Sequence, residues 1–256
     1  MSAPAAAARR IIVDLDGTDR TALAYARLFA AEPGSPLGVA TATVDVRQGG
    51  TGQGGVGHRV LFAVEDHEAA TRLLHRRGET VTTDQWGSVL DRFPYLGVTA
   101  EYGATEHGGA EDNEKSGDNE GSGDIVALDH VVLTSRDRDG AVALCSGVLG
   151  LDFRLDSEAF GMRQLFFRAP ATVVEVVLTG DDGLGGLAWR SRDLAATRTR
   201  LLAAGCEVSE IRTGRKPGTR VATVRDPELL LPTLLLEQRE RHDPSASTSA
   251  AFGIRE

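Results

Sequence analysis

The chain repeats part of its own sequence. Residues 60–81 align without a gap on residues 187–208 after a shift of 127 positions. The matched pairs include Asp66 with Asp193, Leu74 with Leu201 and Gly78 with Gly205, and aromatic residues coincide at Phe62 and Trp189. In the same way, "VDLDGTDRTALAYARLF" matches "LTSRDRDGAVALCSGVL" at an offset of 118 or 119 residues. Such a duplication restricts the fold to architectures that repeat one supersecondary unit.

The repeated unit has the order strand, helix, strand, strand, strand. In the C-terminal half, β-rich runs predict the strands, and helical spacing followed by glycine predicts the helices. The first unit has strands at 125–134, 151–157, 162–169 and 172–179 with a helix at 138–150, and the second opens with a strand at 186–192 and a helix at 193–205. Asp66 and Asp193 stand just before helices, where we expect them to act as caps. The sequence therefore predicts an α+β protein of paired βαβββ modules.

A change in composition divides the chain. Residues 105–124 are almost free of apolar side chains and rich in Gly, Asp, Glu, Asn and Ser, so they cannot bury enough surface to offset their chain entropy. We interpret them as a flexible acidic linker between a first domain at 1–104 and a second domain at 125–239. The polar residues 240–256 are predicted to form a disordered tail.

Charge and composition exclude several classes of protein. The formal net charge of −9 repels phosphate backbones and anionic lipid surfaces, so nucleic acid and membranes are not expected partners. No apolar run approaches a membrane-spanning length, and the N-terminus lacks the order of a secretory signal, which favours a cytoplasmic location. Cys145 and Cys206 lie in apolar patterns without CxxC spacing, and we expect buried, reduced thiols.

The stretch "LDHVVLTSRDRDGAVALCSGVLGLDFR" resembles the start of a vicinal oxygen chelate domain. This superfamily includes glyoxalase I, extradiol dioxygenases, methylmalonyl-CoA epimerase and bleomycin-resistance proteins. The resemblance covers 125–239 and, more weakly, 8–104. It implies curved, cup-like mixed sheets in two tandem domains, with a divalent ion such as Fe, Mn, Ni or Zn on the concave face. A metal of this kind can polarise a substrate's oxygen atoms.

The resemblance also implies particular site residues. His130 matches the first-strand metal ligand, and Glu175 and Glu237 match the late-strand glutamates, which would serve as ligands and as the groups that move a proton. Gly186 stands where the family often has a second histidine. The leading hypothesis is thus a protein that binds a small oxygenated metabolite in the C-terminal cup and, if it holds a divalent ion there, catalyses isomerase, lyase or epimerase chemistry. The alternative is a metal-free protein that binds or sequesters a metabolite or antibiotic, as a monomer or a homodimer.

Further residues are candidates for the ligand pocket. Phe166 and Trp189 could line it, and the cationic turn containing Arg215 and Lys216 could hold an anionic substrate, although such a turn is more often a solvated hairpin. A buried Glu175 needs a partner. Besides a metal or a ligand donor, that partner could be Arg163 or Arg190, from neighbouring predicted strands.

The N-terminal half contains a motif with a different meaning. "IIVDLDGT" has the letters of a phosphatase nucleophile, with Asp14 as the attacking carboxylate. The only candidate for the acidic pair that such chemistry needs, Asp181 and Asp182, lies across the linker in the other half, and the duplication explains the motif as a strand running into a helix. We therefore expect Asp14 and Asp16 near a strand end, a helix opened by Thr18 or Asp19, and no metal in this half.

Overall fold

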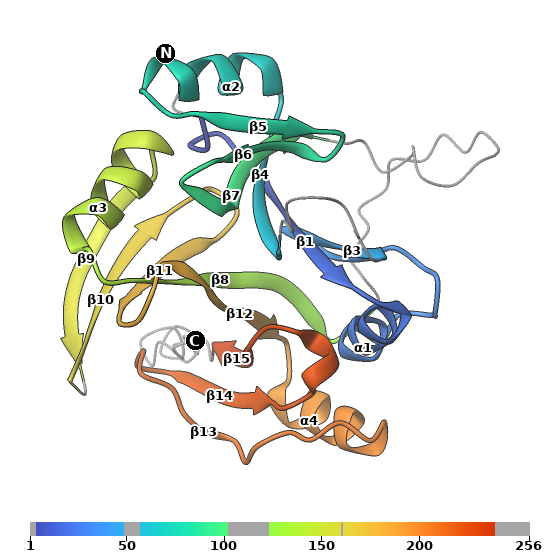
Figure 1. Ribbon diagram of the computed structural model, residues 1–256. Coiled ribbons are helices and arrows are strands. Elements are labelled where there is room, and N and C mark those ends of the chain that lie inside the picture. Colours follow the sequence, from blue (N-terminus) through green and yellow to red (C-terminus); the bar gives the residue numbers. More distant parts are fainter. Residues whose placement is uncertain (1–3, 49–56, 102–122, 160, 239–256) are drawn as a thin grey trace, which may run out of the picture.

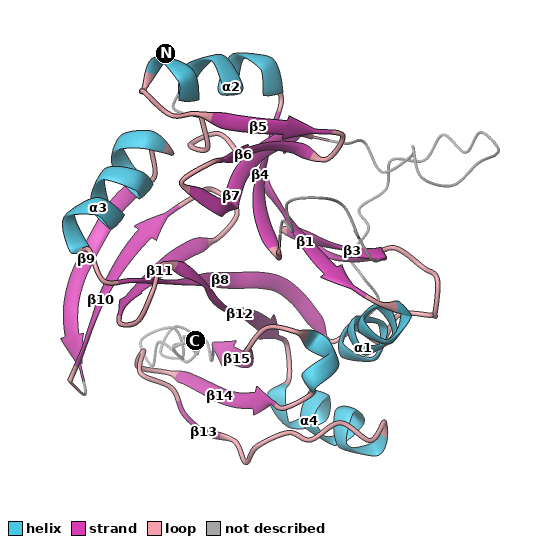
Figure 2. Ribbon diagram, viewed as in Figure 1, coloured by secondary structure: helices cyan, strands magenta, loops and turns pink. Residues whose placement is uncertain are grey.

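The computed structural model describes residues 4–48, 57–101, 123–159 and 161–238. The predicted linker, except for its last two residues, and the predicted tail lie outside these ranges. The described residues form two mixed β-sheets with helices on one face of each (Figures 1 and 2). None of the helices in these ranges is long and apolar enough to cross a membrane.

The first sheet has seven strands in the order β2-β3-β1-β4-β7-β6-β5. Its strands are β1 (Arg10–Gly17), β2 (Leu37–Val39), β3 (Ala42–Gln48), β4 (Arg59–Val64), β5 (Val81–Asp84), β6 (Gly87–Leu90) and β7 (Phe93–Ala100). Helices α1 (Asp19–Phe29) and α2 (His67–Arg76) follow β1 and β4. The two helix-leading strands, β1 and β4, pair antiparallel at the centre of the sheet.

The second sheet has eight strands in the order β13-β14-β15-β12-β8-β11-β10-β9. They are β8 (Ile125–Ser135), β9 (Asp152–Ala159), β10 (Met162–Arg168), β11 (Val173–Leu178), β12 (Gly183–Ser191), β13 (Arg212–Thr213), β14 (Thr219–Val224) and β15 (Thr233–Gln238). Helix α3 (Arg138–Val142) continues as a π-helical segment, Ala143–Val148, and α4 (Leu194–Ala203) follows β12. A short 3₁₀ turn, Pro227–Leu229, leads into β15.

The two sheets share one topology. In each half, two first strands pair antiparallel at the centre, and each first strand pairs parallel with the last strand of its own unit: β1 with β3, β4 with β7, β8 with β11 and β12 with β15. This arrangement confirms the predicted α+β class. Among the described residues, β9 has no counterpart in the first sheet.

Helix boundaries follow the expected capping chemistry. The side chain of Asp66 accepts a hydrogen bond from Ala69 N at 2.8 Å, and Asp193 accepts from Ala195 N and Ala196 N. Each interaction satisfies N–H groups that the first helical turn leaves free. The shift of 127 residues that relates the two sequences therefore also relates helices α2 and α4 and their caps.

The two halves pack through α1. The Phe29 ring lies edge-on to Trp189 with centroids 4.9 Å apart, and the Tyr25 hydroxyl donates to Leu229 O at 3.2 Å. Arg200 of α4 donates to the carbonyl oxygens at the end of α1 and pairs with Asp124. A cation at a helix C-terminus also complements the helix dipole. Buried apolar residues of both halves consequently form one continuous core.

Candidate functional site

We call the face of the second sheet opposite α3 and α4 its open face. The alternation of side chains along each strand decides which residues lie on it. Val131 and Leu133 of β8 and Val174 and Val176 of β11 belong to the core on the helix side. Because successive side chains of a strand point to opposite faces, His130 and Glu175 lie on the open face. Figure 1 shows this sheet curved, with α3 and α4 on its outer side.

A β-bulge next to His130 adds a second polar residue to this face. Ala188 of β12 pairs with His130, but the next residue, Trp189, pairs with Leu128, so Asp129 is the extra residue on β8. A bulge interrupts strict alternation and re-aims a side chain. The Asp129 carboxylate therefore lies beside the imidazole, with Oδ2 3.0 Å from Nδ1 of His130.

His130 lies between two carboxylates. An ionised carboxylate only accepts hydrogen bonds, so Nδ1 donates its proton to Asp129, and Nε2 is left facing Oε2 of Glu175 at 3.5 Å. The other oxygen of Glu175 accepts a short hydrogen bond from the side-chain amide of the buried Gln164. The Glu175 side chain is 13% exposed. A carboxylate and an imidazole with a fixed orientation thus face the open side together.

Arg190 binds the other carboxylate oxygen of Asp129. Its guanidinium donates to Oδ1 of Asp129 at 2.9 Å, and its own side chain is 47% exposed. Burial alone would raise the pKa of Asp129, but hydrogen bonds from His130 and Arg190 outweigh it and hold that pKa below its usual value. Asp129 therefore stays ionised and keeps the imidazole oriented. Asp129, His130, Glu175, Gln164 and Arg190 are called the polar cluster below.

Glu237 does not join the polar cluster, which corrects its prediction as a metal ligand and catalytic group. In one unit Val173 pairs with His130 and Glu175 follows two residues later; in the other, Leu234 pairs with Ala188. The residue two positions after Leu234 is Leu236, so Leu236 is the equivalent of Glu175. Glu237 lies one position further along β15. A shift of one residue places a strand side chain on the opposite face.

Glu237 has a structural role on the helix side. Its carboxylate accepts hydrogen bonds from Leu194 N, in the first turn of α4, at 2.8 Å and from Arg220 at 2.6 Å. The residue is 8% exposed. An anion at this position satisfies a free N–H group and complements the helix dipole. The sequence resemblance placed the right residue type on the right strand but on the wrong face.

The second imidazole expected of the family has no counterpart here. The position opposite His130 is Ala188 rather than Gly186. Gly186 has a φ of 158°, and a Cβ there would lie 2.7 Å from the carbonyl oxygen of Pro232, so its lack of a side chain has a steric cause. Among the described residues, no group of three or more His, Cys, Asp or Glu side chains is placed to hold a metal ion. The predicted metal-binding set does not fit this geometry.

The predicted substrate-binding residues separate into three places. Phe166 is the cross-strand partner of Glu175 and shares the open face. Trp189 is fully buried on the helix side against Phe29, which corrects its assignment to the pocket. Arg215 and Lys216 are exposed in the turn between β13 and β14, where Lys216 O accepts from Thr219 N at 3.1 Å.

The two arginines considered as partners of Glu175 bind other carboxylates. Arg163 pairs with Asp156 at 2.7 Å on the helix side, and Arg190 pairs with Asp129. The partners of Glu175 are Gln164 and His130. Sequence reasoning missed Gln164 and Asp129, because Gln164 is an ordinary polar residue of a strand and a bulge leaves no signal in an alternation pattern.

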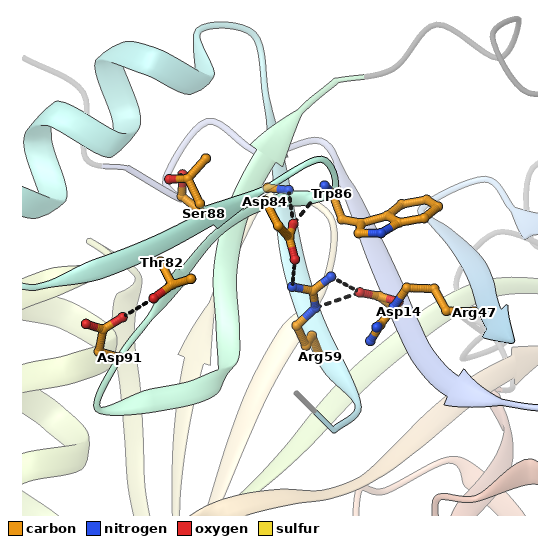
Figure 3. A network of polar contacts seen from close by, with 10 residues as sticks. Asp14, Arg47, Arg59, Thr82, Asp84, Trp86, Ser88 and Asp91 are labelled. Carbon is orange, nitrogen blue, oxygen red and sulfur yellow. Dashed lines mark hydrogen bonds and ion pairs between the residues drawn. The ribbon is translucent and has the colours of Figure 1, made fainter. Parts of the chain in front are cut away.

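On the face of the first sheet opposite α1 and α2, charged side chains form a network of polar contacts (Figure 3). Asp14 is 1% exposed and Arg59 is fully buried, and Nε of Arg59 donates to Asp14 at 2.6 Å. Arg47 contacts the other oxygen of Asp14. Arg59 also reaches Asp84 at 2.8 Å, which accepts from the backbone N–H of Trp86.

This charged network leaves no accessible nucleophile. Burial alone would lower the pKa of Arg59, but hydrogen bonds to Asp84 and Asp14 and their charges outweigh it and raise the pKa, so the guanidinium remains charged. Both oxygens of Asp14 are engaged by arginines, so the buried carboxylate cannot attack a substrate. Asp14 lies inside β1 rather than after it, whereas Thr18 caps α1 as expected.

No family model matches the chain, and no curated protein matches it in sequence. Among solved structures, methylmalonyl-CoA epimerase from Mycobacterium tuberculosis is similar at 21% identity with a TM-score of 0.42, covering 47% of this chain and 93% of the epimerase. A Streptomyces coelicolor methylmalonyl-CoA epimerase in complex with 2-nitronate-propionyl-CoA matches at 16% identity with a TM-score of 0.40, covering 45% of this chain and 99% of that protein. Each match thus extends over less than half of the present chain.

Proposed function

We propose that the open face of the second sheet binds a small molecule with two neighbouring oxygen atoms and that it does so without a resident metal. The proposal assigns the C-terminal half to the vicinal oxygen chelate type of protein, which its sequence resembles. The observation that carries it is the pair formed by His130 and Glu175, both partly exposed and both oriented by neighbours, Asp129 and Gln164.

The donors and acceptors of this pair suit a hydroxycarbonyl compound. The Glu175 carboxylate accepts a hydrogen bond from a ligand hydroxyl, and Nε2 of His130 is the neighbouring group that can meet the ligand's second oxygen. Nε2 of His130 accepts when the ring is neutral and donates when it is charged. A ligand inserted between His130 and Glu175 would replace their 3.5 Å contact with two shorter, charge-assisted hydrogen bonds.

A second candidate function is proton transfer on the bound molecule. The supporting observation is that Glu175 is 13% exposed and lies next to an imidazole, so it can remove a proton from the carbon beside a carbonyl and exchange it through His130. This would be isomerase or epimerase chemistry carried out by side chains alone. Incorporation of deuterium from D₂O at that carbon, followed by NMR, distinguishes it from simple binding.

The binding test uses two glutamates as a matched pair. Binding of hydroxyacetone and 1-hydroxy-2-butanone is measured by ligand-observed NMR for the wild type, Glu175→Gln and Glu237→Gln. A hydrogen bond to a charged group contributes about 1.5–3 kcal/mol, so Glu175→Gln should weaken binding by about tenfold or more. Glu237→Gln should leave Kd unchanged, because Glu237 lies on the other face. Equal losses in both variants, or full affinity in Glu175→Gln, would contradict the proposal.

A further inference from the structure

Apolar side chains continue the open face beyond the polar cluster. Leu155 of β9 pairs with Phe166 of β10, which in turn pairs with Glu175. Residues paired across strands share a face, so these three side chains form a row. Met162 lies on the same face because it is four residues before Phe166 on β10. Leu155 and Met162 are 52% and 36% exposed.

Two charged residues of the same strands, Asp156 and Arg163, point the other way. Asp156 accepts hydrogen bonds from Arg138 of α3 and from Arg163, both at 2.7–2.8 Å, on the helix side. Phe153 also lies on that side, with its ring 5.1 Å from that of Phe167. The open-face positions between Leu155 and Met162 on the outer strands include Ser157 and Gln164, which are uncharged. The stretch of the open face from Leu155 and Phe166 to Met162 is therefore uncharged, whereas Arg168 lies on the same face two residues beyond Phe166.

Leu155, the most exposed residue of this apolar surface, belongs to the strand that distinguishes the two halves. Strand β9 is one of the two edge strands of the second sheet, and the described part of the first sheet lacks its counterpart. The partly exposed leucine and methionine lie next to a half-buried phenylalanine. Covering these apolar side chains with a hydrocarbon removes them from water, which is favourable in free energy. Because Phe166 and Glu175 are adjacent across strands, one small molecule can reach both surfaces.

We propose that Leu155, Met162 and Phe166 form an apolar subsite that holds the hydrocarbon part of the ligand whose oxygen atoms bind at Glu175 and His130. The inference rests on the proposed function and specifies its ligand as an amphiphilic hydroxyketone with an alkyl chain of several carbons. The polar cluster fixes the head of such a molecule, and the apolar subsite selects for the length of its chain.

The experiment compares a homologous series. Hydroxyacetone, 1-hydroxy-2-butanone, 1-hydroxy-2-hexanone and 1-hydroxy-2-octanone are titrated by ligand-observed NMR into the wild type, Leu155→Ser, Glu175→Gln and a control, Leu202→Ser. Leu202 is 42% exposed on α4, on the other side of the sheet. Both serine variants alter exposed side chains and are expected to fold.

The wild type and Leu202→Ser should gain about fourfold in affinity for each methylene that enters the subsite. Leu155→Ser should reduce this gain per methylene while binding hydroxyacetone normally, and Glu175→Gln should weaken all four compounds by a similar factor.

Three results would overturn the inference. Affinity independent of chain length in the wild type would remove the apolar subsite but leave the proposed function intact. No binding of any of the four compounds would remove both. A dimer detected by light scattering that Leu155→Ser dissociates would show that the apolar residues serve contact between two copies of the chain instead.

Discussion

The buried ion pair of the first sheet allows a quantitative prediction about stability. In Arg59→Met, a side chain of similar length without charge replaces a fully buried guanidinium. Asp14, which is 1% exposed, then keeps only Arg47 as a cationic partner, and Asp84 loses its ion pair. Removing one partner of a buried pair leaves an uncompensated charge and costs about 3–5 kcal/mol.

The double variant Asp14→Leu with Arg59→Met tests the cause of this loss. Replacing a buried ion pair by apolar groups of similar volume is often close to neutral, so the double variant should regain most of the stability lost in Arg59→Met. The control is Arg72→Met, because Arg72 forms an exposed pair with Glu68, with side chains 62% and 85% exposed. Its loss should stay below about 1 kcal/mol.

Urea unfolding followed by far-UV circular dichroism gives the free energies of unfolding. A loss in Arg59→Met no larger than that in Arg72→Met would refute the assignment of a tightly packed, desolvated ion pair. A double variant no more stable than Arg59→Met would show that packing of the guanidinium, rather than the unpaired charge of Asp14, dominates the effect.

Three further predictions follow from register, burial and charge. Ala188→His should create micromolar or tighter Ni²⁺ binding by calorimetry, because position 188 faces an existing imidazole, whereas Gly186→His should not and should lower stability. Burial raises the pKa of the Cys145 thiol to about 12, so iodoacetamide at pH 8 should modify it only in urea concentrations that unfold the protein. Hydrogen bonds from Arg163 and a second arginine lower the pKa of Asp156 to about 2. The contribution of Asp156 to stability is therefore complete above its unfolded-state pKa and is lost as the pH falls towards 2, and Asp156→Asn should lack this part of the acid dependence in pH-resolved urea titrations.

The sequence was sufficient for features that depend on local pattern. The 127-residue shift located two equivalent helices, and Asp66 and Asp193 were identified as their caps because a carboxylate before a helix has one common use. The buried state of Cys145 likewise followed from its apolar neighbours. These predictions succeed because neighbouring residues along the chain determine them.

The residues of the candidate site depend on the pairing register of the strands. The sequence alone does not determine that register to within one residue. Glu237 and Leu236 differ by a single position, and only strand pairing decides which of them shares a face with His130. Alternation alone would put Asp129 on the opposite face from its neighbour His130. A bulge brings it to the same face. The sequence does not place Trp189, because an aromatic residue fits a pocket and a core equally well and its contact partner Phe29 comes from a distant segment.

Binding of a hydroxyketone by Glu175 and His130 without a metal is tested by titrating 1-hydroxy-2-hexanone into the full chain with and without excess EDTA, monitored by ligand-observed NMR. We expect the same Kd in both conditions and a Kd at least about tenfold weaker for Glu175→Gln. Binding that disappears with EDTA and returns when a divalent ion is added would contradict this expectation.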